Sequence, residues 1–139
     1  MAALHDMIAR WSAVAAVCVA LVGCSGLTQT PFQRLAGEAA GTLAAAAETL
    51  TEHRQGRLSE AYAQASFVSF AEALRGVGER LPREEGAPRT ESTRRLGQEL
   101  QQTEPLLEAP CLASSGCDAS TQIRQLKAVS EDMLQASQP

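Results

Sequence analysis

Acid–base or metal chemistry needs histidine and carboxylate side chains at spacings that let them meet, and the chain offers one such group. Glu48 and Glu52 lie one helical turn apart, and His53 follows directly. A di-iron bundle uses a Glu-x-x-His pair, but Leu50 stands three residues before His53. Two carboxylates at this spacing are more typical of a solvated helix face, and we expect His53 to be a surface or partly packed residue. We therefore expect no metal site here.

Short motifs for cofactors and nucleophiles are missing from the sequence. It contains no Cys-x-x-Cys-His for haem attachment, no Gly-rich phosphate loop and no Gly-x-Ser-x-Gly turn. We expect no catalytic residues, no cofactor and no enzymatic activity. The net charge of −4, with acidic and basic residues interspersed, also argues against a nucleic-acid partner, which would require a basic face.

The N-terminal segment has the organisation of an export signal. Arg10 precedes an apolar stretch over 11–22 without a charged side chain, and the small residue Gly23 follows it. The stretch is too short to cross a bilayer as a helix, which takes about 20 residues. It is therefore predicted to direct export and not to remain as a permanent anchor. Translation from Met7 gives a cleaner signal than translation from Met1, and both starts stay open.

The apolar stretch ends in Leu21-Val22-Gly23-Cys24. This sequence resembles the lipobox of bacterial lipoproteins, in which an aliphatic residue, a small or aliphatic residue and Gly or Ala precede the lipidated cysteine. The resemblance covers residues 1–24. It implies cleavage between Gly23 and Cys24, a diacylglycerol thioether on Cys24 and often a further acyl group, such as palmitate, on the new amino terminus. An ordinary secretory signal or an uncleaved N-terminal helix is the alternative.

A lipid on Cys24 implies a place in the bacterial cell envelope. Two or three acyl chains exceed what stable anchoring requires, so the membrane becomes the first partner of the chain. In enteric-type bacteria, Ser25 after the cysteine points to the periplasmic side of the outer membrane. In a bacterium that has no outer membrane, the expected place is the outer face of the cell membrane. The predicted organisation is a signal peptide over 1–23, a polar lipidated tether over 24–31 and a helical domain over 32–139.

Two further cysteines, Cys111 and Cys117, enclose a short loop rich in Ser and Gly. An exported protein meets an oxidising environment, in which a disulfide is the default state of such a pair. With Cys24 assigned to lipid and Cys18 inside the signal, Cys111 and Cys117 are the partners that remain. The alternative is a redox pair, but redox motifs usually separate their cysteines by two residues at the start of a helix.

Two other patterns carry a functional and a structural interpretation. A group of arginines could contact an anionic lipid or polymer, but interleaved glutamates favour a solvated mixed face. Phe67 and Phe70 could line a pocket for an apolar ligand, although core packing is the commoner use of such a stripe. The arginines of the group are Arg75, Arg80, Arg83, Arg89, Arg94 and Arg95, and the glutamates are Glu79, Glu84, Glu85 and Glu91.

The elements that must position these residues are helices. Ala, Leu, Gln, Glu and Arg dominate the exported part, while β-branched and aromatic residues are scarce. Apolar residues recur at steps of three and four from Phe32 to Leu50, and again from Ala63 to Leu81. Between these stretches, Gly56 indicates a turn and Ser59 a helix cap, with one long helix as the alternative. Pro82 is predicted to end the second helix.

The third and fourth helices have weaker patterns. The third begins near Glu91 and has only Leu96 and Leu100 as apolar positions before Pro105 forces a stop, a kink or a restart. The fourth begins after Asp118 or Ser120, and its apolar positions are Ile123, Leu126, Val129 or Ser130, and Met133. The expected fold is an all-α, small antiparallel four-helix bundle, or three helices plus one, with one short-loop disulfide.

The function that these patterns favour is that of an envelope lipoprotein acting as a structural or protein-interaction module. A second envelope protein is then a possible partner. The alternative is a helical binding module that holds a small apolar ligand or lipid between its helices. A closed core with an exposed apolar face would favour the interaction module, whereas a pocket between the helices would favour the ligand-binding module. The sequence leaves the oligomeric state open.

Overall fold

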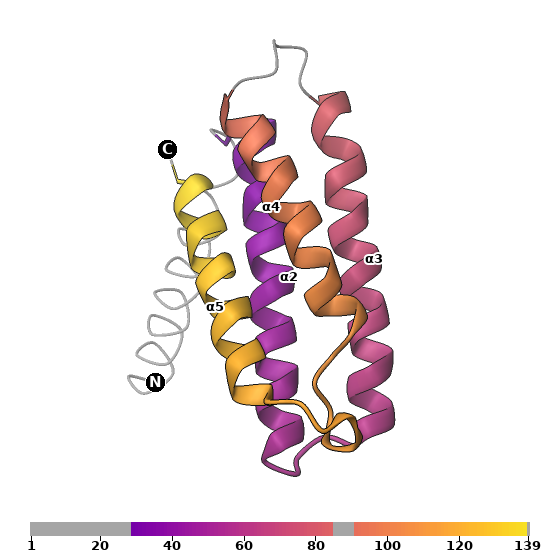
Figure 1. Ribbon diagram of the computed structural model, residues 1–139. Helices are drawn as coiled ribbons and strands as arrows, with labels where there is room; N and C mark the ends of the chain where they lie inside the picture. Colours follow the sequence, from indigo (N-terminus) through magenta and orange to yellow (C-terminus); the bar gives the residue numbers. More distant parts are fainter. Residues whose placement is uncertain (1–28, 85–90, 139) are drawn as a thin grey trace, which may run out of the picture.

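The computed structural model describes residues 29–84 and 91–138, and within these residues it is all-α (Figure 1). The described part contains four α-helices, one short 3-10 helix and no strand, which confirms the expected fold class. The elements in chain order are α2 (Pro31–Arg54), α3 (Glu60–Glu84), α4 (Glu91–Glu108), η1 (Ala113–Ser115) and α5 (Ala119–Ala136).

Helix α2 begins with a capping box. The Thr30 hydroxyl accepts a 3.2 Å hydrogen bond from the Gln33 backbone N–H, and the Gln33 side chain accepts one of 2.8 Å from the Thr30 N–H. Pro31 occupies the first turn, where its missing N–H costs nothing. The helix therefore begins at Pro31, one residue inside the segment that was predicted to be tether.

A true turn separates α2 from α3. Gly56 has a φ of 73°, the left-handed conformation that favours glycine, and it follows Gln55, the C-cap of α2. The Ser59 hydroxyl then accepts a 3.2 Å hydrogen bond from the Tyr62 N–H and caps α3. Two helices, and not one long helix, are confirmed at this point.

The two prolines that were expected to interrupt helices lie inside them. Helix α3 continues through Pro82 to Glu84, so its predicted end was wrong. Helix α4 continues through Pro105 to Glu108, which excludes a stop at Pro105. Each proline lies in the last turns of its helix, where it removes a single intrahelical hydrogen bond. Continuing α4 buries Leu107, which is 1% exposed, and this burial offsets much of the proline's cost of about 3 kcal/mol.

Consecutive helices run antiparallel, as Figure 1 shows, with α2 packed between α3 and α5. Helix α4 lies mainly against α3 and contacts α5 less extensively. The bundle therefore has two distinct ends. We call residues 53–60 and 109–120 the loop end, and we call residues 31–35, 81–84, 91–96 and 133–137 the tether end.

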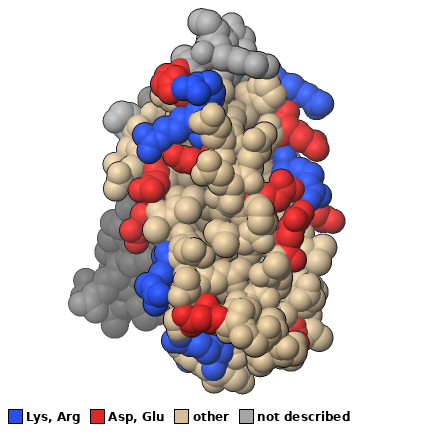
Figure 2. Space-filling model, in the orientation of Figure 1, with Lys and Arg blue, Asp and Glu red and all other residues tan. Residues whose placement is uncertain are grey.

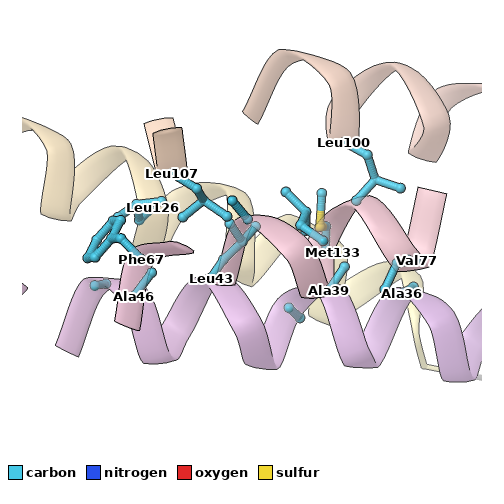
Figure 3. Packing of buried hydrophobic residues seen from close by; sticks show 14 of the residues in the cluster. Ala36, Ala39, Leu43, Ala46, Phe67, Val77, Leu100, Leu107, Leu126 and Met133 are labelled. Atoms are coloured by element: carbon cyan, nitrogen blue, oxygen red, sulfur yellow. The ribbon is translucent and has the colours of Figure 1, made fainter. Parts of the chain in front are cut away.

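Alanine and leucine dominate the core. Small residues on α2, including Ala36, Ala39 and Ala46, let the larger side chains of the other helices approach closely (Figure 3). Phe67 is fully buried, whereas Phe70 is half-buried and packs edge-on against Phe67 with ring centroids 5.8 Å apart. The prediction that the phenylalanine stripe serves core packing is confirmed.

The predicted apolar positions of α5 are also inward-facing. Ile123, Leu126 and Met133 are buried, Ser130 is buried beside them, and Val129 is half-buried. The hydroxyl of Ser130 donates a 2.8 Å hydrogen bond to the Ala40 carbonyl oxygen and so satisfies its own polar group in the core. Helix α4 adds two buried threonines, Thr93 and Thr103, to its thin leucine stripe.

Candidate functional site

The residues with distinctive chemistry in the described part of the chain gather at the loop end. Gly23 and Cys24, the predicted cleavage and lipid-attachment residues, lie outside the described residues, as does Cys18. The cysteine pair and His53 both lie at the loop end, although 58 residues separate His53 from Cys111 in the sequence. The antiparallel arrangement of the helices brings them together.

The disulfide between Cys111 and Cys117 is present, as predicted. Its sulfur atoms are 2.00 Å apart and its Cα atoms 5.6 Å apart. Cys111 is 5% exposed and belongs to the packed interior, whereas Cys117 is exposed. Between them the chain forms η1 and then turns back at Gly116, whose φ is 68°. The disulfide loop, residues 111–117, is thus fixed to the core at one side and open to solvent at the other.

Gln122 connects the disulfide loop to two helices. This side chain on α5 is only 7% exposed. Its oxygen accepts a 2.6 Å hydrogen bond from the Cys111 backbone N–H, and its nitrogen donates to the carbonyl oxygens of Leu106 (2.6 Å) and Ala109 (3.1 Å). Gln122 was not predicted from the sequence. Its position four residues before Leu126, on the apolar face of α5, was the available signal.

His53 contacts two separate backbone segments. Its Nδ1 lies 3.0 Å from the Leu58 carbonyl oxygen in the turn, and its Nε2 lies 3.4 Å from the backbone nitrogen of Ala113 in the disulfide loop. The ring is half-buried, so the expectation of a partly packed residue is confirmed. A carbonyl only accepts and an amide N–H only donates, which assigns the proton to Nδ1 in a neutral ring.

Further polar contacts surround the disulfide loop. Arg54 donates to the Ser120 hydroxyl, and Ser114 donates to the Glu60 carboxylate. Asp118 caps α5 by accepting a 3.0 Å hydrogen bond from the Ser120 N–H. The hydrogen bond from the Thr121 hydroxyl, followed by the one from Ser120, lowers the pKa of Asp118 below its ordinary value.

An open hollow of about 350 Å³ lies between the end of α2, the disulfide loop and the start of α5. Its wall combines two leucines with an imidazole, a guanidinium and a carboxylate. The lining residues include Leu50, His53, Arg54, Leu112, Asp118 and Ser120. Within residues 29–84 and 91–138, no three His, Cys, Asp or Glu side chains come close enough to hold a metal ion.

Glu48 and Glu52, the carboxylates considered for acid–base chemistry, differ in exposure and in their contacts. Glu48 is exposed, while the carboxylate of Glu52 receives two hydrogen bonds from the Arg57 guanidinium across the turn. The hydrogen bond from Arg57 lowers the pKa of Glu52. The pair thus lies on a solvated helix face, and Glu52 ties the end of α2 to the turn.

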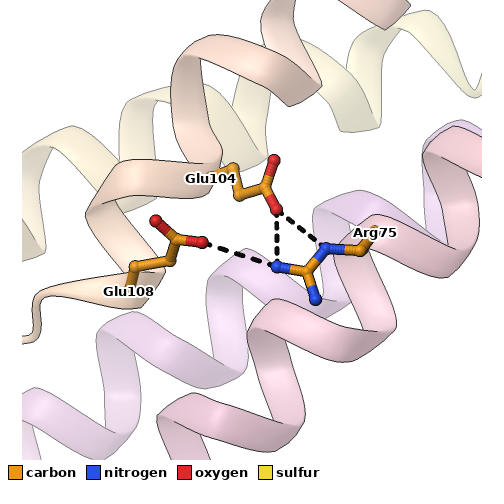
Figure 4. Close-up of polar contacts among 3 residues, drawn as sticks. All are labelled: Arg75, Glu104 and Glu108. Carbon is orange, nitrogen blue, oxygen red and sulfur yellow. Dashed lines mark hydrogen bonds and ion pairs between the residues drawn. The ribbon is translucent and has the colours of Figure 1, made fainter.

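Four arginines of the group are paired with glutamates. Arg75 on α3 bonds Glu104 on α4 at 2.8 and 3.0 Å and approaches Glu108 at 3.4 Å (Figure 4). Positive and negative side chains alternate in the view of Figure 2, as the mixed-face interpretation predicts. The other ion pairs of the group join Arg80 with Glu38, Arg94 with Glu91, and Arg95 with Glu99. Arg89 lies outside the described residues.

Comparison with known proteins yields no relative: no protein-family model, curated protein or solved structure matches the chain. Among the helices that the structure describes, none is long and apolar enough to span a membrane.

Proposed function

We propose that this chain is an exported lipoprotein, held to the bacterial cell envelope by acyl chains on Cys24, whose helical bundle serves as a structural or protein-interaction module. The Leu21-Val22-Gly23-Cys24 sequence supports the anchor. The Cys111–Cys117 disulfide is the observation that carries the proposal, because disulfides persist mainly in oxidising compartments outside the cytosol. A motif and a covalent bond in different parts of the chain therefore favour the same compartment.

The tether keeps the bundle near its membrane. Helix α2 begins at Pro31, seven residues after Cys24, and seven extended residues reach at most about 24 Å. The tether end of the bundle therefore faces the lipid. The 24 residues of α2 rise by about 36 Å, which leaves the loop end free to point away from the membrane.

The surface of α3 supports an interaction role. Residues 61–71 carry no charge, and six of their side chains are exposed. Tyr62 is 60% exposed and Val68 is 53% exposed, although both are large and apolar enough to favour burial. We call this set the α3 face: Ala61, Tyr62, Gln64, Ala65, Val68 and Ser69. In Figure 2 the surface toward the loop end of α3 is largely free of charged side chains.

A binding module for a small apolar ligand has less support. Phe67, Leu74 and Val77, on the inner face of α3, are at most 2% exposed and belong to the closed core. The hollow between α4 and α5, about 290 Å³, is open, and charged side chains such as Arg95 and Glu99 line it beside Phe32 and Leu96, unlike an enclosed apolar pocket. The closed core and the exposed α3 face together favour a partner surface.

The anchor is tested by intact-mass and N-terminal analysis of protein purified from its native membrane. The expected mass corresponds to residues 24–139 with acyl groups and one disulfide. Replacing Cys24 by Ser should abolish acylation and release the protein from membranes, whereas the matched change of Cys18 to Ser should leave the mature protein unchanged. An unlipidated chain that retains residues before Cys24 would overturn the proposal.

The interaction role is tested separately with a photo-crosslinking residue placed at Val68 in the full chain. We expect a discrete cross-linked adduct in native membranes from Val68, and none from the same residue placed at Lys127, which is exposed on α5. Identical adduct patterns from both positions, or none from either, would contradict a specific role for the α3 face.

A further inference from the structure

His53 stands between two segments that the fold brings together at the loop end. Nδ1 faces the Leu58 carbonyl oxygen at 3.0 Å, and Nε2 faces the Ala113 backbone nitrogen in a longer contact of 3.4 Å. A carbonyl oxygen cannot donate a proton and an amide N–H cannot accept one. Of the protonation forms available to imidazole, only the neutral ring with its proton on Nδ1 satisfies both contacts.

We infer that His53 is a pH-sensitive latch, which holds the disulfide loop against the turn when its ring is neutral and releases the loop when the ring is protonated. A proton on Nε2 would point at the Ala113 N–H, so that two donors oppose each other. The contact between Nδ1 and Leu58 survives protonation, because Nδ1 donates in both forms. The ring therefore stays with the turn while the loop is released.

The charged groups around the ring come from every element at this end. They are Glu52 and Arg54 on α2, Arg57 in the turn, Glu60 on α3 and Asp118 before α5. Glu52 is paired with Arg57, Arg54 and Asp118 line the same hollow with opposite charges, and Glu60 accepts from Ser114. The imidazole makes its contacts with Leu58 and Ala113 through their backbone groups, so its protonation acts directly on the Ala113 hydrogen bond.

Release of the loop is confined by the contacts that protonation leaves intact. The side chain of Gln122 still accepts the hydrogen bond from the Cys111 N–H, and the disulfide still joins Cys111 to Cys117. Ser114 also still donates to the Glu60 carboxylate, so the part that protonation frees is the backbone at Ala113. Ala113 lines the hollow beside Leu50 and Leu112, which are 1% and 6% exposed, so movement of its backbone changes the wall of the hollow. The latch thus regulates the shape of the hollow at the loop end.

The Ala113 amide and the disulfide provide two readouts in the full chain in detergent micelles. In NMR spectra between about pH 8 and pH 5, the Ala113 amide signal should shift with the same midpoint as the His53 ring signals.

The second readout is the rate at which a water-soluble phosphine reduces the Cys111–Cys117 disulfide. Between the higher and the lower pH, this rate should rise by about fivefold more in the parent chain than in a His53→Gln variant, in which a neutral oxygen can replace Nε2 as acceptor. An Ala113 signal that stays fixed while His53 titrates, or equal acceleration in both proteins, would overturn the latch. If His53→Gln does not fold, the NMR titration of the unaltered chain decides alone.

Discussion

The backbone N–H of Cys111 donates a 2.6 Å hydrogen bond to the side-chain oxygen of Gln122, which belongs to the first turns of α5. The same side chain donates to two carbonyl oxygens, Leu106 in the last turn of α4 and Ala109 just after it. Carbonyls at the end of a helix lack intrahelical partners, so this buried amide acts as the missing cap of α4. The disulfide loop is therefore held by a polar contact as well as by its covalent bond.

Replacing Gln122 by Leu should lower the free energy of unfolding by about 1–3 kcal/mol, because the Cys111 N–H and the helix-end carbonyls lose their partner in a buried place. Urea denaturation measures the change. Gln125→Leu is the matched control, since Gln125 is exposed on the same helix and its replacement should change stability little. An equal effect of the two substitutions would show that the hydrogen bonds of Gln122 contribute nothing specific.

Replacing Phe67 by Ala should destabilise the bundle by about 3–5 kcal/mol, because the fully buried ring leaves a cavity among the four helices. Val68→Ala, at the next residue but 53% exposed, should change the free energy of unfolding by less than about 0.5 kcal/mol. Both values come from urea denaturation followed by circular dichroism at the helical band. A small loss for Phe67→Ala would contradict its central place in the core.

Local sequence signals were sufficient for the helices and for one turn. Each helix buries a single stripe, so spacings of three and four residues identified inward positions such as Leu43 and Leu74. Gly56 and Ser59 act on their immediate neighbours, which is why their residue types alone predicted the turn. The disulfide was predictable for a different reason, because the expected export left Cys111 with one partner.

Contacts that depend on distant residues were not predictable in this way. The position of Pro105 inside α4 depends on the burial of Leu107 against other helices, which outweighs the local preference of proline to end a helix. Gln122 and His53 acquire their roles from backbone groups that only the folded chain brings close. The lipid site at Cys24 lies outside the described residues and stays a prediction.

Two glycines should respond in opposite directions to alanine. Gly56→Ala should lower stability by about 1–2 kcal/mol, since its φ of 73° is a left-handed conformation that opposes a Cβ atom. Gly41→Ala should raise stability by about 0.5–1 kcal/mol, because Gly41 lies inside α2 and a Cβ there meets no atom within 4 Å. Thermal unfolding of both variants checks the signs. A change in stability of the same sign in both variants would mean that backbone conformation does not decide the effect of the substitution.

Removing the disulfide by the double change of Cys111 and Cys117 to Ser should lower the free energy of unfolding by about 2 kcal/mol, a value typical of closing so short a loop. The helices should persist, since Gln122 still binds the backbone at position 111. Circular dichroism measures helix content, and urea denaturation measures stability. Loss of helix content in the variant would show that the covalent bond is required for the fold itself.

Acidification should remove a stabilising contribution from Asp118. Hydrogen bonds from Thr121 and Ser120 lower its pKa in the folded state. The carboxylate therefore stabilises the fold fully above its unfolded-state pKa of about 3.9. This stabilisation is lost progressively as the pH falls through the lower folded-state pKa. Asp118→Asn keeps an acceptor for Ser120 but cannot titrate. In urea denaturation at a series of pH values, the parent chain should therefore exceed this variant in stability at neutral pH, and the difference should shrink below about pH 4. A difference that stays constant down to about pH 2 would mean that the charge of Asp118 plays no part in capping α5.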